Sequence, residues 1–222
     1  FVKKNKDFKI GIYPIIVDKF LPAGTTKSQY FHQDLYVATK IYQNNPKHHF
    51  DIGSRIDGFV AHVASFRKLT IIDIRTLEIN KKNIDFLQMD LMNPKLSEFE
   101  NKMESLSCLH TIEHLGLGRY GDKLDINGHL KGLNNIFKLL KTNAFFYFSV
   151  PLGLNKVYFN AHRTFSIDYL LKYLEGKFIL EEFSYVNDEG IFFEKANLNE
   201  DIHKLNSLNF GLGIFILRKI DK

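Results

Sequence analysis

The first residues of this 222-residue chain that could bind a ligand form the run Asp51-Ile-Gly-Ser-Arg-Ile-Asp-Gly. This run lies between a predicted strand and a predicted helix. At such a junction a parallel sheet offers backbone amides and a helix N-terminus to a ligand. Gly53 would let the backbone approach the ligand, and Asp51 would accept a hydrogen bond from a cationic amino group or order a water. Ser54 and Arg55, in the same turn, are also expected to contact the bound cofactor. An ordinary tight turn is the alternative, because short glycine motifs recur by chance.

Two more carboxylates follow the next two predicted strands. Asp73, twenty residues after Gly53, ends a β-branched run just before Ile74. An acidic residue at that distance and strand end can bind both hydroxyls of a ribose. Asp90 would accept a hydrogen bond from the exocyclic amine of adenine, and Leu91 would donate its backbone amide. For Asp73 the alternative is a loop aspartate that caps the following turn.

The run His-Thr-Ile-Glu-His at 110–114 is the most distinctive source of acid–base chemistry. A hydroxyl is a poor nucleophile until a base takes its proton, and histidine titrates in the useful range. We predict His114 as that base, with Glu113 orienting it or the substrate and His110 bordering a cofactor. A histidine satisfied by backbone at a helix N-terminus is the alternative for His114.

A glycine-punctuated loop follows, and three of its polar residues are candidates for binding an acceptor. Arg119, Tyr120 and Asp122 lie among Gly116, Gly118 and Gly121, and the loop can fold over a substrate. For Arg119 the alternative is a structural ion pair with Asp122 or Asp125.

A second candidate pair, His162 and Arg163, follows the fifth predicted strand and precedes a capped helix. In an open α/β sheet this loop reaches over the carboxyl edge, where acceptors bind. His162 is an alternative base, and Arg163 would hold a phosphate or carboxylate of the substrate. A loop packed against the following helix explains both residues equally well.

The run 110–114 also fits H-x-x-E-H, the inverted zinc-peptidase signature. That reading requires the five residues on one helix, so that both histidines face one metal, and a third ligand downstream. The residues before His110 favour a strand, and Gly116 and Gly118 would end such a helix at once. We therefore expect no metal site, and keep a zinc hydrolase using His110, Glu113 and His114 as the weaker rival.

These candidates need a sheet that brings strand ends together. Apolar periodicity predicts helices over 28–43, 57–66, 129–140 and 166–174, the last capped by Ser166, and strands over 49–52, 69–74, 84–89, 106–110, 145–150, 178–185 and 210–218. Pro151 would stop the fifth strand, and no convincing helix separates the last two, which favours antiparallel pairing. We predict an α/β fold: a doubly wound, mostly parallel seven-stranded sheet ending in an antiparallel strand pair. Residues 1–222 would form one domain, with 1–46 as an N-terminal embellishment.

Three acceptors on three successive strand ends, with a terminal antiparallel pair, resemble the class I S-adenosylmethionine-dependent methyltransferases. A nicotinamide enzyme would require G-x-G-x-x-G for a pyrophosphate, but Arg55 and Asp57 stand where its later glycines belong. S-Adenosylmethionine carries no phosphate and tolerates an acidic loop with fewer glycines.

The runs at 51–59, 73–75 and 110–122 also resemble, from about Tyr30 to the last strand, a methyltransferase-like family of unknown function that shares E-H-x-G-L-G-R-Y-G-D. That resemblance implies the methyltransferase fold, S-adenosylmethionine as cofactor, and an association with surface polysaccharide or sugar modification.

Composition narrows the class of protein further. One cysteine excludes an internal disulfide framework and fits a reducing cytoplasm, and no apolar run reaches the roughly 20 residues that span a bilayer. A net charge of +5 without a basic cluster does not indicate nucleic acid. We expect a methyltransferase acting on a hydroxyl of a small-molecule, carbohydrate, nucleotide-sugar or surface-glycan acceptor. A non-catalytic binding module in glycan assembly and a homodimer stay open alternatives.

Overall fold

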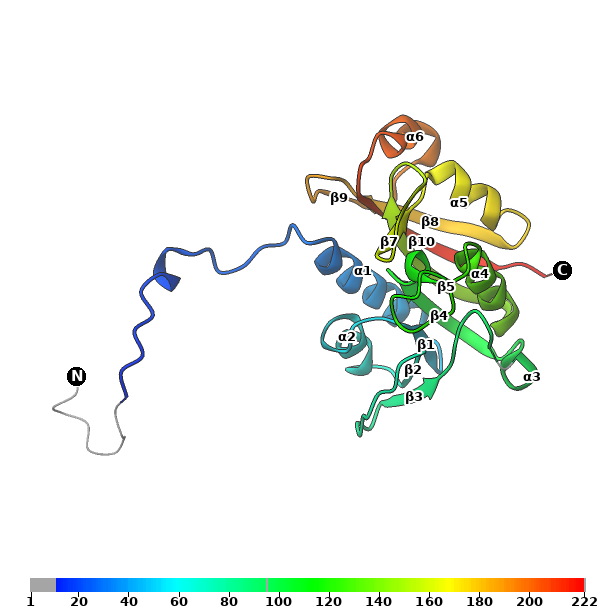
Figure 1. Cartoon of the computed structure of the whole chain (residues 1–222), viewed down its shortest axis with the longest axis horizontal. Coiled ribbons are helices and arrows are strands. Elements are labelled where there is room, and N and C mark those ends of the chain that lie inside the picture. Colours follow the sequence, from blue (N-terminus) through cyan, green and yellow to red (C-terminus); the bar gives the residue numbers. More distant parts are fainter. Residues whose placement is uncertain (1–10, 95, 222) are drawn as a thin grey trace.

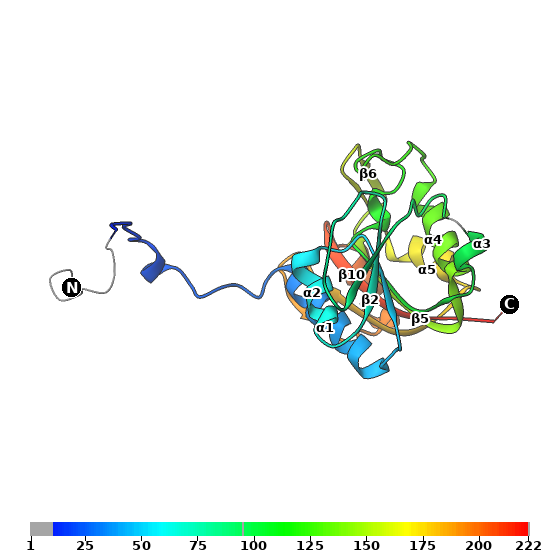
Figure 2. The same ribbon diagram turned by 90° about the horizontal axis from the view of Figure 1, so that it is seen from below.

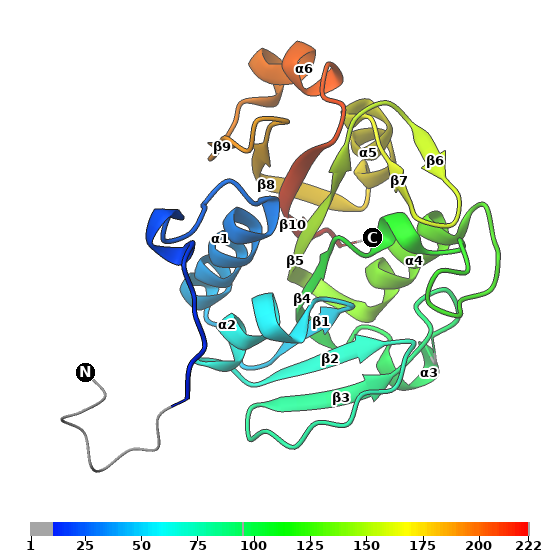
Figure 3. The same cartoon turned by 60° about the vertical axis from the view of Figure 1, so that its left-hand side comes forward.

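A computed structural model describes residues 11–94 and 96–221, built around one eight-stranded sheet in the order β3-β2-β1-β4-β5-β10-β8-β9 (Figures 1 and 3). The sheet strands are β1 His49–Ile52, β2 Leu69–Asp73, β3 Ile84–Gln88, β4 Met103–Leu109, β5 Leu140–Leu152, β8 Phe178–Val186, β9 Phe192–Phe193 and β10 Gly211–Lys219. A separate hairpin pairs β6 Lys156–Tyr158 with β7 His162–Thr164. The α-helices are α1 Gln29–Asn44, α2 Ala61–Ala64, α3 Leu96–Phe99, α4 Gly128–Leu139, α5 Ile167–Leu174 and α6 Leu198–Asn206.

The strand directions confirm the predicted fold class. β3, β2, β1, β4 and β5 are parallel, and β10 is antiparallel to both of its neighbours, β5 and β8. The strand count differs slightly from the predicted seven, because the two-residue β9 pairs with β8 at the edge of the sheet. The carboxyl ends of β1, β2 and β4 therefore meet at one edge, where the candidate residues follow them.

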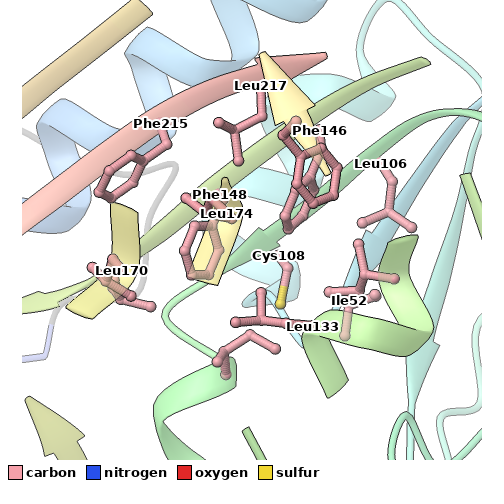
Figure 4. Close-up of a cluster of buried hydrophobic side chains, with 14 of the residues drawn as sticks. Ile52, Leu106, Cys108, Leu133, Phe146, Phe148, Leu170, Leu174, Phe215 and Leu217 are labelled. Carbon is pink, nitrogen blue, oxygen red and sulfur yellow. The ribbon is translucent and has the colours of Figure 1, made fainter. Parts of the chain in front are cut away.

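The sheet is buried on both faces, which explains its near-continuous apolar strands. Along β5, Phe146 and Phe148 join the core on one face, while Tyr147 joins the core on the other. Figure 4 shows the first of these cores, with Ile52 and Cys108 facing Leu133 of α4. Helices α1 and α2 lie on one side of the sheet, and α4 and α5 on the other (Figure 2). The two layers hold the strand ends in fixed positions.

Several elements differ from the sequence prediction by more than one residue or in kind. β5 begins at Leu140 and continues through Pro151, whose carbonyl still accepts from the Phe165 N–H at 3.1 Å. β4 begins at Met103, three residues before the predicted start. The predicted helix over 57–66 is a π-helical turn, Ile56–Val60, followed by the short α2, because Gly58 has non-helical dihedrals. Helix α6 lies in a segment for which the sequence analysis expects no helix, and it packs on the core through Leu198, Ile202 and Leu205.

The N-terminal part of the chain divides at residue 29. Residues 11–28 are irregular apart from one 3₁₀ turn, Asp18–Phe20, and extend away from the folded body (Figure 1). Helix α1 instead packs against the sheet through Val37, Ala38 and Ile41. Its first turns reach the edge where the candidate residues gather.

Candidate functional site

Two adjoining cavities lie at the carboxyl edge of the parallel strands. The larger, about 730 Å³, is bordered by the start of α1, the loops after β1, β2 and β4, and the β6–β7 hairpin. The smaller, about 60 Å³, is lined largely by apolar side chains, including Ile74, Met89, Leu91 and Leu115. Six residues line both: Gly53, Asp73, Arg75, His110, His114 and Tyr120. The fold thus gathers residues that are far apart in the sequence around one junction.

Asp51 shapes the first loop from below and lines neither cavity. Its carboxylate is fully buried and accepts hydrogen bonds from the Ser54 N–H at 3.1 Å, the Ser54 hydroxyl at 2.8 Å and the Ser107 hydroxyl. Burial raises the pKa of Asp51 to about 6, against the opposing effect of these hydrogen bonds. The direct ligand contact expected of Asp51 does not fit this geometry, because the side chain is fully buried and lines neither cavity.

Position 53 requires glycine because the side chain of Thr111 leaves no room for a Cβ atom. The φ of Gly53 is +71°, and a Cβ there would lie 2.8 Å from both Oγ1 and Cγ2 of Thr111. Glycine at this position thus has a structural reason within the protein, in addition to the close approach of a ligand that the sequence analysis expects. Beyond it, Ser54 and Arg55 line the larger cavity, and Arg55 pairs with Asp57 through Nη2 and Oδ2 at 2.9 Å.

Asp73 lies at the end of β2 with its carboxylate already engaged. Arg75 donates from its backbone N–H at 2.8 Å, from Nε at 3.0 Å and from Nη2 at 2.7 Å. The Arg75 guanidinium also lies 4.5 Å from the ring centroid of Tyr120, which forms the opposite wall. A ribose at Asp73 must therefore share the carboxylate with Arg75 or replace it.

Asp90 and Leu91 line the smaller cavity beside Ile74. Asp90 Oδ1 accepts from the Met92 N–H at 2.8 Å, while no described residue donates to Oδ2. Leu91 is buried, and its carbonyl accepts from Asn135 Nδ2 at 3.0 Å. This arrangement leaves one carboxylate oxygen facing an apolar slot, as a flat amine-bearing ring would require.

His110, Glu113 and His114 form one acid–base group, in which Glu113 is buried and the two histidines are partly buried. His110 has a φ of +50°, and its Nδ1 lies 2.9 Å from Oε1 of Glu113, which is only 1% exposed. The same oxygen lies 3.8 Å from His114 Nε2. Within the described part of the chain, His110 Nε2 and Glu113 Oε2 are buried without a hydrogen-bond partner. Buried polar atoms without partners are costly, so this wall of the cavity is suited to a polar ligand.

The tautomer of His114 follows from its backbone contact. Its Nδ1 lies 2.7 Å from the Ala161 carbonyl, which accepts only, so Nδ1 carries the proton and Nε2 the lone pair. The 3.4 Å approach of Arg119 Nη1 to the same Nδ1 is therefore a contact between two donors, and Arg119 donates instead to the Ala161 carbonyl at 3.0 Å. Burial lowers the pKa of His114, opposed by the charge of Glu113. His114 is thus a neutral imidazole at pH 7.

The glycine-rich loop after Glu113 is organised by Asp122. Its carboxylate accepts from the backbone N–H groups of Gly116, Gly118 and Tyr120, at 2.7, 3.2 and 3.2 Å. Asp122 borders the smaller cavity but is mostly buried, so its expected substrate contact gives way to this turn. Arg119 forms neither of the ion pairs considered for it and lies 5.1 Å from the Tyr120 ring.

His162 and Arg163 are adjacent on β7 but have different surroundings. His162 lines the larger cavity, and burial lowers its pKa. Arg163, in contrast, is only 3% exposed and donates to the carbonyls of Glu113, Leu115 and Ile126. The substrate-binding prediction for Arg163 is wrong, because its guanidinium is consumed in holding the hairpin to the loop.

Sequence reasoning missed the contribution of α1. Tyr30, Gln33 and Asp34 line the larger cavity, and the Tyr30 ring lies 5.1 Å from that of His110. Burial raises the pKa of Tyr30 and of Asp34. The helical spacing predicted α1 itself, but nothing in it distinguishes the face that meets a strand edge from an ordinary polar face.

The helix required by the zinc-peptidase signature does not form. His110 has left-handed dihedrals after β4, and only Ile112–His114 make a single 3₁₀ turn. Among residues 11–94 and 96–221, no group of three or more His, Cys, Asp or Glu side chains is placed to hold a metal ion. The same residues include no helix long and apolar enough to cross a membrane.

Solved structures that share this fold include a cyclase and two methyltransferases. The [4+2]-cyclase SpnF aligns with a TM-score of 0.61 and 10% identity, over 90% of this chain and 86% of its own. The 1,6-didemethyltoxoflavin-N1-methyltransferase of Burkholderia thailandensis, solved with S-adenosylhomocysteine, gives 0.56 and 16%, over 85% and 79%. The N-methyltransferase NodS of Bradyrhizobium japonicum, also solved with S-adenosylhomocysteine, gives 0.57 and 11%, over 86% and 88%. At these identities the likeness establishes the Rossmann-like methyltransferase fold.

Sequence comparison places the chain in a family whose activity is not known. Residues 59–220 match the family described as "Caenorhabditis protein of unknown function, DUF268", and the chain belongs to it. The matched region includes the run 110–122 and begins where the run 51–59 ends. No curated protein matches the sequence.

Proposed function

We propose that this DUF268 protein is an S-adenosylmethionine-dependent O-methyltransferase whose acceptor is a hydroxyl of a carbohydrate, nucleotide-sugar or surface-glycan precursor. The observation that carries the proposal is the junction of the two cavities, where Asp73 and His114 line both. An adenine ring at the smaller cavity, with its ribose at the junction beside Asp73, would bring the cofactor next to an acceptor in the larger cavity. The fold shared with methyltransferases solved with S-adenosylhomocysteine supports the choice of cofactor.

The residues at the strand ends fit this cofactor. Asp73 would bind the ribose hydroxyls, while Asp90 Oδ2 and the Leu91 amide would bind adenine beside Ile74. The turn at 53–55 would hold the amino-acid end, with Asp51 fixing that turn from beneath. S-Adenosylmethionine supplies a methyl group activated by the positive sulfur. The protein has only to position an acceptor oxygen in line with it and remove a proton.

Proton removal is assigned to His114. Its Nδ1–H is held by the Ala161 carbonyl, so Nε2 presents the lone pair that accepts the hydroxyl proton. The imidazolium formed would then be stabilised by Glu113 Oε1, 3.8 Å away, while His110 holds that carboxylate in place at 2.9 Å. His162, across the same cavity, is the second candidate base.

The class of acceptor is inferred from the polar atoms of His110 and Glu113 that lack described partners and from the family resemblance. His110 Nε2 and Glu113 Oε2, buried without described partners, would gain hydrogen bonds from a polyhydroxylated ligand. Arg119 and Tyr120 border the same space and would face the acceptor. Asp122 and Arg163 support these residues from behind.

The test is methyl transfer with a defined set of acceptors. The purified protein is incubated with S-adenosylmethionine and monosaccharides, oligosaccharides or nucleotide sugars, and S-adenosylhomocysteine and methylated acceptor are measured by mass spectrometry. Product that forms with the wild type and is lost in His114→Gln supports the proposal. If S-adenosylhomocysteine binds but no acceptor in the set is methylated, the non-catalytic binding module becomes the better description.

A further inference from the structure

A group of exposed apolar side chains lies on two loops joined by a hydrogen bond, the loop before α4 and the loop that forms the β6–β7 hairpin. We call it the apolar rim; its members are Leu124, Ile126, Leu154, Val157, Tyr158 and Phe159. Ile126 is 79% exposed and Phe159 is 75% exposed, so these are fully presented side chains. Scattered exposed apolar residues need no explanation, but six large ones on two adjacent loops indicate an interaction site.

The two loops are held together by hydrogen bonds. Arg163 Nη2 donates to the Ile126 carbonyl at 3.2 Å, and Arg119 Nη1 donates to the Ala161 carbonyl at 3.0 Å. His114 donates to the same Ala161 carbonyl. In Figures 2 and 3 the loop before α4 and the β6–β7 hairpin lie on one side of the molecule, away from the N-terminal segment. The apolar rim is therefore presented by a fixed frame that also carries the candidate base.

The charges of the apolar rim that lack a described ion-pair partner are positive. Lys123 and Lys156 are exposed between its members, and neither forms an ion pair with a described residue. The one carboxylate within the rim, Asp125, is neutralised by Lys131 and accepts from the Asn127 N–H at 2.9 Å. The whole chain carries a net charge of +5. A partner that covers this face would thus be apolar at the centre and negatively charged around it.

We propose that the apolar rim docks this protein on the surface of an anionic lipid bilayer. None of its six members lines the two cavities of the candidate site, and a flat lipid surface needs no groove in its partner. Phe, Tyr and branched aliphatic side chains beside lysines form the combination that enters the headgroup region, where the apolar part is buried and ammonium groups meet lipid phosphates.

Docking in this orientation brings the mouth of the larger cavity to the membrane surface. The hairpin that carries Val157 and Phe159 also carries His162, which lines that cavity. If the proposed methyl transfer is correct, the acceptor would be carried on a lipid, such as a glycan precursor attached to a membrane anchor. The docking itself does not depend on that activity.

Vesicle co-sedimentation tests the proposal. Full-length protein is mixed with phosphatidylcholine vesicles, or with vesicles in which a quarter of the lipid is phosphatidylglycerol. We expect sedimentation with the anionic vesicles, at least a fivefold loss of bound fraction in the double variant Val157→Ser/Phe159→Ser, and a similar loss in Lys123→Glu/Lys156→Glu. Ile179→Ser, which changes an exposed apolar side chain on β8 outside the rim, should bind like the wild type. Circular dichroism verifies folding of each variant.

Four results would overturn the proposal: wild-type protein that stays in the supernatant with both vesicle types, a rim variant that sediments like the wild type, an Ile179→Ser loss equal to that of the rim variant, or rim-dependent self-association without vesicle binding. The exposed apolar segment around Ile12–Val17 is the same in every variant, so it cannot produce a difference between them. S-Adenosylhomocysteine binding by the rim variants in solution is measured in parallel, and its presence or absence reports on the proposed function separately.

Discussion

Arg75 occupies the carboxylate that the proposed cofactor needs. Its ion pair with Asp73 is bidentate, but the guanidinium is more than half exposed, and exposed pairs contribute only about 0–1 kcal/mol. We therefore predict that Arg75→Ala frees Asp73 and tightens S-adenosylhomocysteine binding by about twofold to fivefold. Titration calorimetry measures this, with Arg218→Ala as a control that removes another carboxylate-paired arginine, the partner of Glu181, which lines neither cavity. A tenfold loss of affinity in Arg75→Ala would mean that Arg75 itself holds the ligand.

His114 should give methyl transfer a defined pH dependence. Burial lowers its pKa below the usual 6.5, and the neutral form is the active base, so the rate falls as the pH drops through that lowered pKa. We predict a plateau at pH 7 and above, and a half-maximal rate below pH 6.5. His114→Gln should lower turnover by about 10²–10⁴-fold and leave S-adenosylhomocysteine affinity unchanged. A half-maximal rate above pH 7, or turnover preserved in the variant, would exclude His114 as the base.

Among the individual site residues, those that lie close together in the sequence could be predicted. The group His110, Glu113 and His114 was visible because its members lie within five residues, and the structure brings all three to one wall. Tyr30 and Asp34 were invisible, because their role depends on where α1 meets the sheet edge. Arg163 was misassigned, since sequence does not show whether a loop guanidinium faces a cavity or the carbonyls behind it.

The loop at 115–122 depends on one glycine more than on its neighbours. Gly116 has a φ of +79°, and a Cβ there would lie 1.9 Å from the Asp125 carbonyl oxygen, whereas at Gly121, with a φ of +87°, a Cβ would meet nothing within 4 Å. We predict that Gly116→Ala costs more than about 2 kcal/mol of unfolding free energy, and Gly121→Ala only about 1 kcal/mol. Urea denaturation compares them; equal losses would show that conformation alone, without the backbone clash, sets the cost.

Elements with strong periodicity or a clear cap were predictable, and weakly patterned ones were not. Ser166 was expected to begin a helix, and its side chain accepts from the Tyr169 N–H at 3.3 Å, as the cap of α5. Helix α6 escaped prediction because its apolar stripe is short: only Leu198, Ile202 and Leu205 face the core, and the rest of its nine residues are polar or charged. Pro151 was expected to end β5, but its missing donor costs little where the carbonyl keeps a partner.

Across the whole molecule, buried histidines link stability to pH. Burial lowers the pKa of His49 to about 3 and of His129 to about 4, so each takes up a proton on unfolding below pH 6.5. Asp51, with its pKa raised to about 6, opposes this between about pH 4 and 6, because the folded state binds that proton first. The histidines outweigh it, and we predict a loss on the order of 2 kcal/mol of unfolding free energy from pH 7 to pH 5.

Urea denaturation at the two pH values measures this difference. The variant His129→Phe removes one of the two histidines while keeping an aromatic ring beside Phe165, so it should show a clearly smaller loss. A wild-type stability that is constant or rises on acidification would contradict the assignment of both histidines as neutral in the folded state.

The central claim is that the carboxyl edge of this sheet binds S-adenosylmethionine, and calorimetric titration with S-adenosylmethionine and S-adenosylhomocysteine tests it most directly. We predict saturable binding of both, and at least a tenfold loss of affinity in Asp73→Ala, because that carboxylate would lose both hydrogen bonds to the ribose. Gln29→Ala, at the far wall of the larger cavity, should bind like the wild type. Absence of binding by the folded wild-type protein at millimolar ligand would contradict the account.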